Sequence, residues 1–391
     1  MRTPSSLTGP VVALLVAAPA LAGCSSGTDG EAVRTGGRVL NVISTDRTCE
    51  VSSLEVPAGT LTFEVTNSGA EVTEFYLLGE DGLRVVAEVE NIGPASTRQV
   101  TLNAAPGSYV TACKPGMKGE GIRANFTVTD SEEKAVVTAD QQTLVDEAVS
   151  QYAAYVRDQV DQLLTKTEEF VELYTSGADD AARRLYPDAR THWERVETVA
   201  ESFGDLDPRM DAREADLEPG EAWTGWHRIE KDLWPARAED YTALSAPQRA
   251  ALAEALLADT VVLDTRVQTL TYTVDQIANG SRGLLEEVAL GKVTGEEEFW
   301  SRTDLWDFQA NIDGAKVAYA GVRPILEGAD PELVGVLDER FDALQALLDR
   351  QRVGDGFRYY DELSQDQIKA LSDSVNALSE PLSRLTAAVL A

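Results

Sequence analysis

The chain has 391 residues, a formal net charge of −32 at pH 7, and a hydrophobic content of 43%. This acidity argues against nucleic acid or an anionic membrane surface as a partner. It also raises the concentration of cations near the surface, but solubility alone could account for most of the charge, so the charge is only weak support for a cation-binding function. The hydrophobic content is normal for a globular protein, and the length exceeds what one compact core usually holds, so we expect two domains.

The N-terminal residues predict a lipoprotein signal segment. One basic residue, Arg2, precedes the apolar run 11–22, which is shorter than the roughly 20 residues that a membrane-spanning helix needs. The run leads into LAGC, the pattern of a lipobox, which ends at Cys24. We therefore expect residues 1–23 to be cleaved and Cys24 to carry lipid at the outer face of the cell membrane. An ordinary secretory peptide, cut at another small residue, is the alternative.

The next segments predict a tether and a domain made of strands. Residues 24–37 are rich in Gly, Ser and Thr and poor in apolar residues, as in flexible linkers. Residues 38–130 contain short runs of Val, Thr, Leu and Phe separated by Gly, Pro, Asn and Asp, which predicts an antiparallel sandwich or barrel. The expected strands lie at 39–43, 60–65, 74–78, 98–102, 108–112 and 123–128.

The cysteines of this first domain leave two interpretations open. If Cys24 carries lipid, only Cys49 and Cys113 remain, and outside the cytoplasm they could pair. Cys113 begins the sequence CKPGM, and a cysteine and a methionine beside a short loop are typical of a cupredoxin. The domain has no histidine, so a blue-copper centre with two imidazole ligands is excluded. A Cys49–Cys113 disulfide and a metal site of both cysteines with Glu74 remain.

From residue 141 to the C-terminus the apolar residues recur every three or four positions, after a charged linker at 131–140. The first stripe predicts a helix of more than about 30 residues that stops near Gly177. Further stripes predict an all-helical bundle, and they lie at 188–203, 223–234, 247–278, 282–290, 304–326, 331–350 and 366–390.

The chain has only two histidines, His192 and His227, and both lie in the helical region. His227 and Glu230 are three residues apart, so on a helix they share a face and could bind one cation. An exposed hydrogen-bonded pair is the alternative. The pattern does not favour a zinc peptidase, because HExxH is absent and Lys231 stands where HxxEH needs its second histidine.

Helical periodicity gives separate expectations for the residues around His192. His192 shares an apolar stripe, which predicts a core residue, whereas Glu194 and Glu197 fall on the opposite, solvent side. A site between two packed helical layers would reverse the expectation for both glutamates. Taken alone, Asp211 and Glu287 are typical surface acids.

The order of these features resembles the EfeO family, the extracytoplasmic component of EfeUOB-type iron-uptake systems. The resemblance covers nearly the whole mature chain, and Arg302 departs from it, because relatives often have a histidine there. The stretches that carry the resemblance are 111–117 (TACKPGM), 192–197 (HWERVE), 201–207 (ESFGDLD), 225–230 (GWHRIE) and 303–311 (TDLWDFQAN).

The resemblance implies a cupredoxin-like β-sandwich followed by an all-α imelysin-like domain of two packed four-helix bundles, with a metal site in the cleft between them. Its ligands in the helical domain would be His227, Glu230, Glu194, Glu197, Asp211 and Glu287. Its ligands in the cupredoxin-like domain would be Cys49, Glu74 and Cys113.

The expected function is therefore an iron-binding lipoprotein, not an enzyme, that captures Fe(II) or Fe(III) outside the cell. The carboxylates suit Fe(III), and the cysteines suit copper or a redox step, while zinc could replace iron. The resemblance implies two partners, an EfeU-like membrane permease that receives the iron and an EfeB-like haem peroxidase. An imelysin-type metallopeptidase and a structural or polysaccharide-binding lipoprotein are the alternatives.

Overall fold

The structure is a computed structural model that describes residues 38–131, 138–217, 220–290 and 292–391. The predicted signal segment, the lipidation residue Cys24, the tether at 24–37 and most of the predicted linker lie outside the described residues. Within the described ranges, every helix is too short or too polar to cross a membrane.

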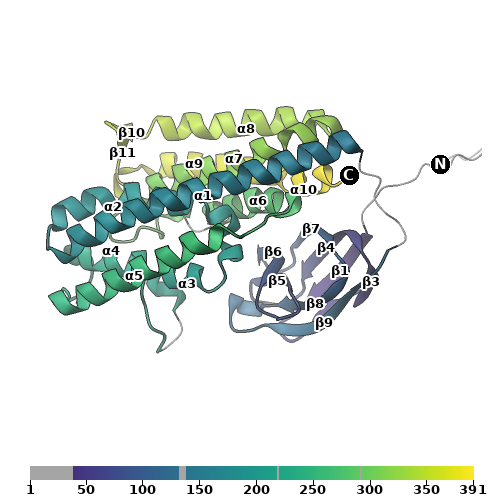
Figure 1. Ribbon diagram of the computed structural model, residues 1–391, viewed down its shortest axis with the longest axis horizontal. Helices are drawn as coiled ribbons and strands as arrows, with labels where there is room; N and C mark the ends of the chain where they lie inside the picture. The colour runs from purple at the N-terminus through teal and green to yellow at the C-terminus, as the bar shows by residue number, and fades with distance from the viewer. Residues whose placement is uncertain (1–37, 132–137, 218–219, 291) are drawn as a thin grey trace, which may run out of the picture. The chain divides into compact units, whose positions relative to one another are not determined.

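The first domain is a sandwich of a four-stranded sheet, β2-β1-β4-β7, and a five-stranded sheet, β3-β9-β8-β5-β6 (Figure 1). The expected antiparallel arrangement is wrong in two places, since β1 pairs in parallel with β4, and β3 with β9. Parallel neighbours require a crossover, and here the chain passes through the other sheet between them. The strands are β1 Arg38–Ser44, β2 Cys49–Val51, β3 Glu55–Pro57, β4 Gly59–Asn67, β5 Thr73–Leu78, β6 Val85–Ile92, β7 Thr97–Ala104, β8 Gly107–Cys113 and β9 Ile122–Thr129.

The strand β6 was not predicted from the sequence, although its residues alternate between the two faces of the sheet. Ala87 and Val89 point into the core of the sandwich, where Phe63 packs its ring against other aromatic side chains. Alternation in a strand sends neighbouring side chains to opposite faces, so Glu88 and Glu90 lie on the outer face of β6.

Cys49 and Cys113 form a disulfide, which joins β2 in one sheet to β8 in the other. This is one of the two interpretations left open by the sequence. While the bond is intact, neither sulfur is a thiolate, and a thiolate is the form of cysteine that binds a metal.

Replacing both cysteines with serine should lower the free energy of unfolding of the sandwich by about 2–4 kcal/mol, because the bond closes a loop across a sequence separation of 64 residues. Amide hydrogen exchange measured by mass spectrometry would show this as faster exchange in β4 and β8. The helical domain provides an internal control within the same molecule. Unchanged exchange in β4 would mean that the disulfide contributes nothing to stability.

The second domain begins with the long helix that the sequence predicts. α1 spans Ala139–Thr175, 37 residues, and a capping box starts it: the Thr138 hydroxyl accepts from the Gln141 N–H at 3.2 Å. It ends just before Gly177, whose φ of 78° is left-handed and favours glycine. The prediction of a long helix that stops near Gly177 is confirmed.

Two predicted helices are interrupted. The stripe at 188–203 divides into α2 (Asp179–Glu194) and the 3-10 helix η2 (Glu197–Phe203). The stripe at 247–278 divides into α5 (Ala246–Val267) and α6 (Val274–Leu290), where Thr273 accepts from the Gln276 N–H and starts a new helix. Apolar periodicity continues through both breaks, so it could not locate them.

Glycines allow η2 to approach its neighbouring helices closely. A Cβ on Gly280 of α6 would lie 2.0 Å from the Thr198 carbonyl oxygen, and one on Gly314 of α7 (Asp304–Ala329) would lie 2.4 Å from that of Arg195. No other residue fits at either position without moving the backbone. This packing brings Glu197, at the start of η2, close to α6 and α7.

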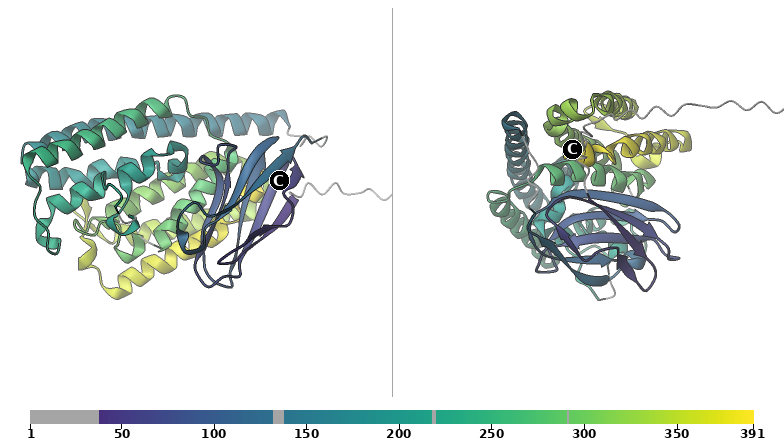
Figure 2. Two further views of the ribbon diagram at one scale, coloured as in Figure 1. Left: turned by 90° about the horizontal axis from the view of Figure 1, so that it is seen from below. Right: turned by 90° about the vertical axis from the view of Figure 1, so that its right-hand side faces the viewer.

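The helices pair as neighbours in two groups. α1 packs along α2 and α5, while α6 packs on α7 and α8 on α9, and α7 also contacts α1 and α2 (Figures 1 and 2). The other elements are α3 Leu206–Asp211, η3 Glu214–Asp216, α4 Trp226–Leu233, η4 Pro235–Arg237, η5 Lys292–Thr294, α8 Pro331–Asp349, β10 Arg352–Val353, β11 Gly356–Phe357, η6 Tyr360–Glu362, α9 Gln365–Leu382 and α10 Leu385–Val389.

Candidate metal centre

A cluster of charged and polar side chains, most of them buried, surrounds His227 in the helical domain. Burying charge is costly unless it is paired or coordinates a metal, so such a cluster marks a candidate functional site. The cluster combines α2, α3, η2, α4, η5, α7 and the segment before α7. Its members are Arg190, Glu194, Glu197, Asp211, His227, Glu230, Lys292, Glu297, Glu298, Asp304, Asp307 and Asn311.

A glycine determines where His227 lies. Gly225, with a φ of 85°, precedes α4, and a Cβ at that position would lie 2.1 Å from the Met210 carbonyl oxygen. Only glycine fits this contact. The start of α4 therefore packs directly on the end of α3, which brings His227 beside Asp211.

The His227 imidazole faces two carboxylates with one nitrogen. Its Nε2 lies 3.5 Å from Asp211 Oδ1 and 3.4 Å from Glu297 Oε1, and it has no hydrogen-bond partner among the described residues although His227 is only 1% exposed. The three ligand atoms all lie within 4.8 Å of one another. One imidazole nitrogen and two carboxylate oxygens at this separation could hold one metal ion.

Glu230 holds the other side of the same imidazole. Its Oε1 accepts from the backbone N–H groups of Trp300 at 2.7 Å and Ser301 at 2.6 Å, and its Oε2 lies 3.4 Å from His227 Nδ1. A carboxylate that binds the second nitrogen of a ligating histidine fixes both the tautomer and the ring orientation. The geometry therefore favours an orienting role for Glu230.

Glu298 completes a second group of possible ligands with His227 and Glu230, but its oxygens already have partners. Its Oε2 accepts from the Ser301 hydroxyl at 2.7 Å, and its Oε1 accepts from Tyr186 Oη at 3.2 Å. Because His227 Nδ1 already faces Glu230 while Nε2 has no hydrogen-bond partner among the described residues, we regard the Nε2 side as the better metal position.

A third group contains Glu194, Glu197 and Asp211. Here the Lys292 ammonium donates to Glu194 Oε2 and to Glu197 Oε2, both at 2.6 Å. The Asn311 amide donates to the same two oxygens at 2.9 and 2.8 Å. This part of the cluster is thus neutralised by a side chain of the protein itself.

Arg190 is fully buried at the centre of the cluster and contacts five carboxylates. Its guanidinium pairs with Glu194 and Asp211, and Nε lies 2.6 Å from Glu298 Oε1. Longer contacts reach Glu297 at 3.5 Å and Asp307 at 3.6 Å. Arg190 therefore holds carboxylates from four segments of the chain close together.

The carboxylates outnumber the buried cations, and their pKa values reflect this excess. Burial, followed by neighbouring negative charge, raises the pKa of Glu197, Glu298 and Asp307 well above the usual range. Burial and Arg190 would lower the pKa of His227, but the neighbouring carboxylates of Glu230, Glu297 and Asp211 raise it to about 10. Without a metal, the centre therefore retains protons that a bound cation would displace.

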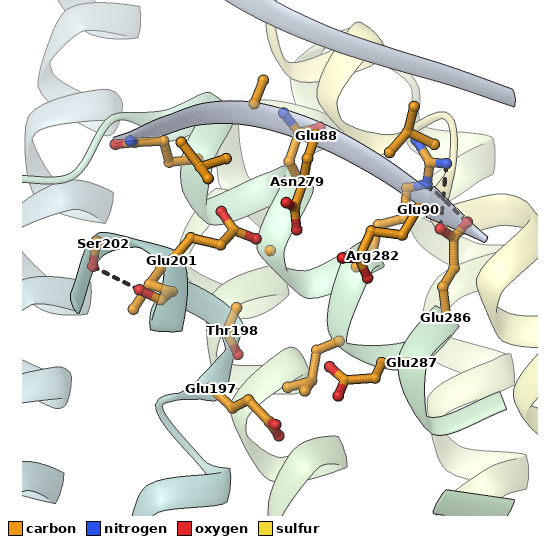
Figure 3. Close-up of a pocket in the computed structure, with 18 of the residues that line it drawn as sticks. Glu88, Glu90, Glu197, Thr198, Glu201, Ser202, Asn279, Arg282, Glu286 and Glu287 are labelled. Atoms are coloured by element: carbon orange, nitrogen blue, oxygen red, sulfur yellow. Dashed lines mark hydrogen bonds and ion pairs between the residues drawn. The ribbon is translucent and has the colours of Figure 1, made fainter. Parts of the chain in front are cut away.

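A cavity of about 90 Å³ lies next to this cluster and is lined by acids from both domains (Figure 3). Glu88 and Glu90 on β6 lie across from Glu197 on η2 and Glu287 on α6. Glu201 lies beside Glu88 and hydrogen-bonds to it. The cavity thus adjoins the metal centre through Glu197.

Known proteins match the chain in both domains. The imelysin family matches residues 148–385, and the cupredoxin-like domain family matches residues 11–128. The chain is 38% identical over 354 residues to the iron uptake system component EfeO of Yersinia pestis, which covers 88% of this chain and 90% of that protein. The EfeO protein of Escherichia coli is 36% identical over 351 residues. The chain belongs to the EfeO family.

A solved structure also resembles part of the chain. It is a putative iron-regulated protein A precursor from Parabacteroides distasonis, 16% identical, with a TM-score of 0.49 over 66% of this chain and 97% of that one. The order of the two family matches along this chain, cupredoxin-like and then imelysin, agrees with the architecture described above.

Several residues that the EfeO resemblance predicts as ligands meet in the cluster. His227, Asp211, Glu194, Glu197 and Glu230 all contribute to the groups of possible ligand atoms, and Glu230 also faces His227 Nδ1 at 3.4 Å. Glu287 does not join any such group within the described residues, and lines the neighbouring cavity instead.

Periodicity was right for His192 and wrong for Glu194. His192 is a core residue, 6% exposed, and its Nδ1 lies 3.0 Å from Gln159 Oε1. Glu194 is fully buried rather than solvated, because α7 and η5 cover the side of α2 that would otherwise face water. The packed-layer alternative is the correct one for this residue.

Sequence reasoning did not single out six residues of the cluster. The Glu297 and Glu298 pair lies in a run of acids that is typical of a solvated surface, and a lone arginine or lysine in an acidic helical region carries no signal. Asp307 and Asn311 lie inside the TDLWDFQAN stretch, which contributes to the resemblance to the EfeO family but assigns no role to either residue. The residues missed are Arg190, Lys292, Glu297, Glu298, Asp307 and Asn311.

In the cupredoxin-like domain, the predicted ligands are not arranged for copper. Cys49 and Cys113 are bonded to each other, and Glu74 is buried with its Oε2 accepting from Tyr76 Oη at 2.9 Å. A disulfide, one carboxylate and no imidazole do not provide a copper site in this state.

The cavity predicts a pH dependence of stability. Burial and then the charges of Glu74, Glu287 and Glu201 raise the pKa of Glu90 to about 8, and burial and then Glu201 raise that of Glu88 well above its usual range. A raised carboxyl pKa stabilises the folded state at low pH, and this contribution is lost as the pH rises through the folded value. The Tm of the metal-free protein should therefore fall as the pH rises from about 5 to about 8.

Thermal unfolding in chelator-treated buffers would check this, with Glu90→Gln expected to flatten the decline and the exposed Glu80→Gln to leave it unchanged. A Tm that is constant or rises over this range would contradict the expectation.

Proposed function

We propose that this protein is the iron-binding component of an extracytoplasmic uptake system, and that Asp211, His227 and Glu297 hold the iron. The observation that carries the proposal is the buried Nε2 of His227, which has no hydrogen-bond partner in the described chain and faces two carboxylates. The relatives named iron uptake system component EfeO support iron as the cargo.

The chemistry of the cluster suits a cation that must be captured and then released. Carboxylates are hard ligands that match Fe(III), and one imidazole also accommodates Fe(II). The surplus of carboxylates attracts a cation, while Arg190 and Lys292 offset part of their charge and so limit the affinity.

The proposal extends to the location and the partners. A lipid on Cys24 would hold the protein at the outer face of the membrane, and tethering raises the effective concentration of a carrier near its permease. An EfeU-like permease would receive the iron, and an EfeB-like haem peroxidase would act in the same system. Thiolates from a reduced Cys49 and Cys113 pair, together with Glu74, could serve a redox step of the first domain.

Iron content provides the direct test. The purified protein would be incubated with ferric citrate or with Fe(II) under nitrogen, separated by gel filtration, and analysed for bound metal. We expect iron to remain bound in the wild type and to be displaced by excess zinc. Protein that elutes without iron from both incubations would contradict the proposal.

Peptidase activity has less support, since a general base must be free to act on water. The HxxE glutamate, Glu230, instead accepts two backbone N–H bonds and faces His227. We expect no cleavage of an unfolded protein substrate at any metal loading, and chelator-sensitive cleavage that Glu230→Ala abolishes would contradict this.

A further inference from the structure

Two of the side-chain groups that could hold a cation share one residue. The first consists of Asp211, His227 and Glu297, and the second consists of Glu194, Glu197 and Asp211. Neighbouring positions that share a carboxylate are the arrangement of two-metal sites, in which the ions lie about 3.5–4 Å apart. The carboxylates of this chain thus form two groups of possible ligands that share Asp211, whose Oδ1 also pairs with Arg190 and whose Oδ2 accepts from Trp193 Nε1 at 2.8 Å.

The second position is occupied by the ammonium group of Lys292. Its Nζ lies 2.6 Å from Glu194 Oε2, 2.6 Å from Glu197 Oε2 and 3.8 Å from Glu297 Oε1, and the side chain is fully buried. These contacts place a positive charge between the carboxylates as a metal ion would be placed.

Asn311 gives a second, independent indication of a cation position. This side chain is fully buried, and its Nδ2 donates to the same oxygens of Glu194 and Glu197, while its own Oδ1 has no partner among the described residues. Rotation of the amide would turn Oδ1 toward the two carboxylates and add a hard oxygen ligand. The position therefore has the oxygen donors that a metal ion requires.

We propose that Lys292 is the tethered occupant of the second position and limits the centre to one bound metal ion. This inference rests on the proposed function, because it assigns a role beside the same His227 site. The fixed charge of Lys292 neutralises Glu194 and Glu197, so a second ion gains little electrostatic attraction and meets a positive charge. A single ion that is not bridged to a second one leaves more readily, which suits a carrier.

Manganese binding by Lys292→Met provides the test, because Mn²⁺ favours carboxylate and imidazole ligands and is paramagnetic. The wild type and the variant would be loaded with MnCl₂, separated by gel filtration, and measured by elemental analysis and electron paramagnetic resonance. We expect the variant to bind one more Mn²⁺ per chain than the wild type, with the spectrum of an exchange-coupled pair. Equal stoichiometry in the two proteins would overturn the proposal.

Matched variants locate the additional ion. Adding Glu197→Gln to Lys292→Met should remove it, whereas Lys316→Met, which replaces an exposed lysine on α7 that pairs with Asp342 at 3.4 Å, should bind like the wild type. An additional ion that persists in the Glu197→Gln double variant would place it elsewhere and overturn the proposal. If Lys292→Met does not fold without metal, refolding by Mn²⁺ with the additional ion bound supports the proposal, and failure to refold overturns it.

The two proposals fail in distinguishable ways. Loss of the wild-type ion in His227→Ala supports the proposed function, and its retention contradicts that function. The difference in stoichiometry between Lys292→Met and the wild type is read separately, since it does not depend on which residue holds the first ion.

Discussion

Replacing His227 with alanine should weaken iron binding by about 100-fold or more, since even the loss of an outer-shell partner typically costs 10–100-fold in metal affinity. The variant removes the one imidazole nitrogen that faces both Asp211 and Glu297. Competition with a chelator of known affinity, followed by elemental analysis, would measure the change. Glu230→Gln should have a smaller effect, about 10-fold to 100-fold, because it alters only the orientation of the ring.

The other histidine of the chain is a matched control for this experiment. His192 is also buried, but it contacts Gln159 and takes no part in the groups of possible ligands found in the described residues. His192→Ala should therefore leave the iron affinity within about twofold of the wild type while it costs some stability. Equal losses in the two variants would show that His227 acts through folding, and would contradict its assignment as a ligand.

Replacing Arg190 with methionine should lower the free energy of unfolding of the metal-free protein by about 3–5 kcal/mol. Breaking a buried ion pair by removing one partner leaves the other charge uncompensated, and here five carboxylates lose their common partner. Urea unfolding of the metal-free variant, monitored by tryptophan fluorescence, would measure the loss, because all six tryptophans lie in the helical domain.

Arg195 provides the comparison for Arg190. It lies near the end of the same helix, its side chain is 30% exposed, and it pairs with Asp313 at 3.2 Å. Arg195→Met should cost about 0–1 kcal/mol, the value typical of exposed ion pairs. Similar losses for the two variants would mean that the carboxylates around Arg190 become protonated at little cost and do not depend on its charge.

Much of the candidate metal centre could be anticipated from the sequence and its resemblance to the EfeO family. The scarcity of histidine left only two candidates, and the HxxE spacing with its flanking residues pointed to His227. The resemblance to the EfeO family added Asp211, Glu194 and Glu197, which the structure does bring together. The disulfide of the first domain was one of the two interpretations that the cysteines allowed, the other being a metal site of both cysteines with Glu74.

The role of Glu230 could not be anticipated, because it depends on a segment distant in sequence. Spacing shows only that Glu230 and His227 share a face of one helix. The two backbone N–H groups that hold the carboxylate come from Trp300 and Ser301, 70 and 71 residues further along the chain. Such contacts arise from the packing of loops on helices, and periodicity does not encode them.

The sequence by itself determined the order of the domains and the change from strands to helices near residue 140, since these follow from composition and local spacing, while the resemblance to the EfeO family pointed to His227. Tertiary structure alone decided which carboxylates meet, that Glu194 is buried, and that Arg190 and Lys292 neutralise part of the cluster. The physical reason is that a helix positions residues only along its own faces. Whether a charged face meets water or a second layer of helices depends on how the whole chain packs.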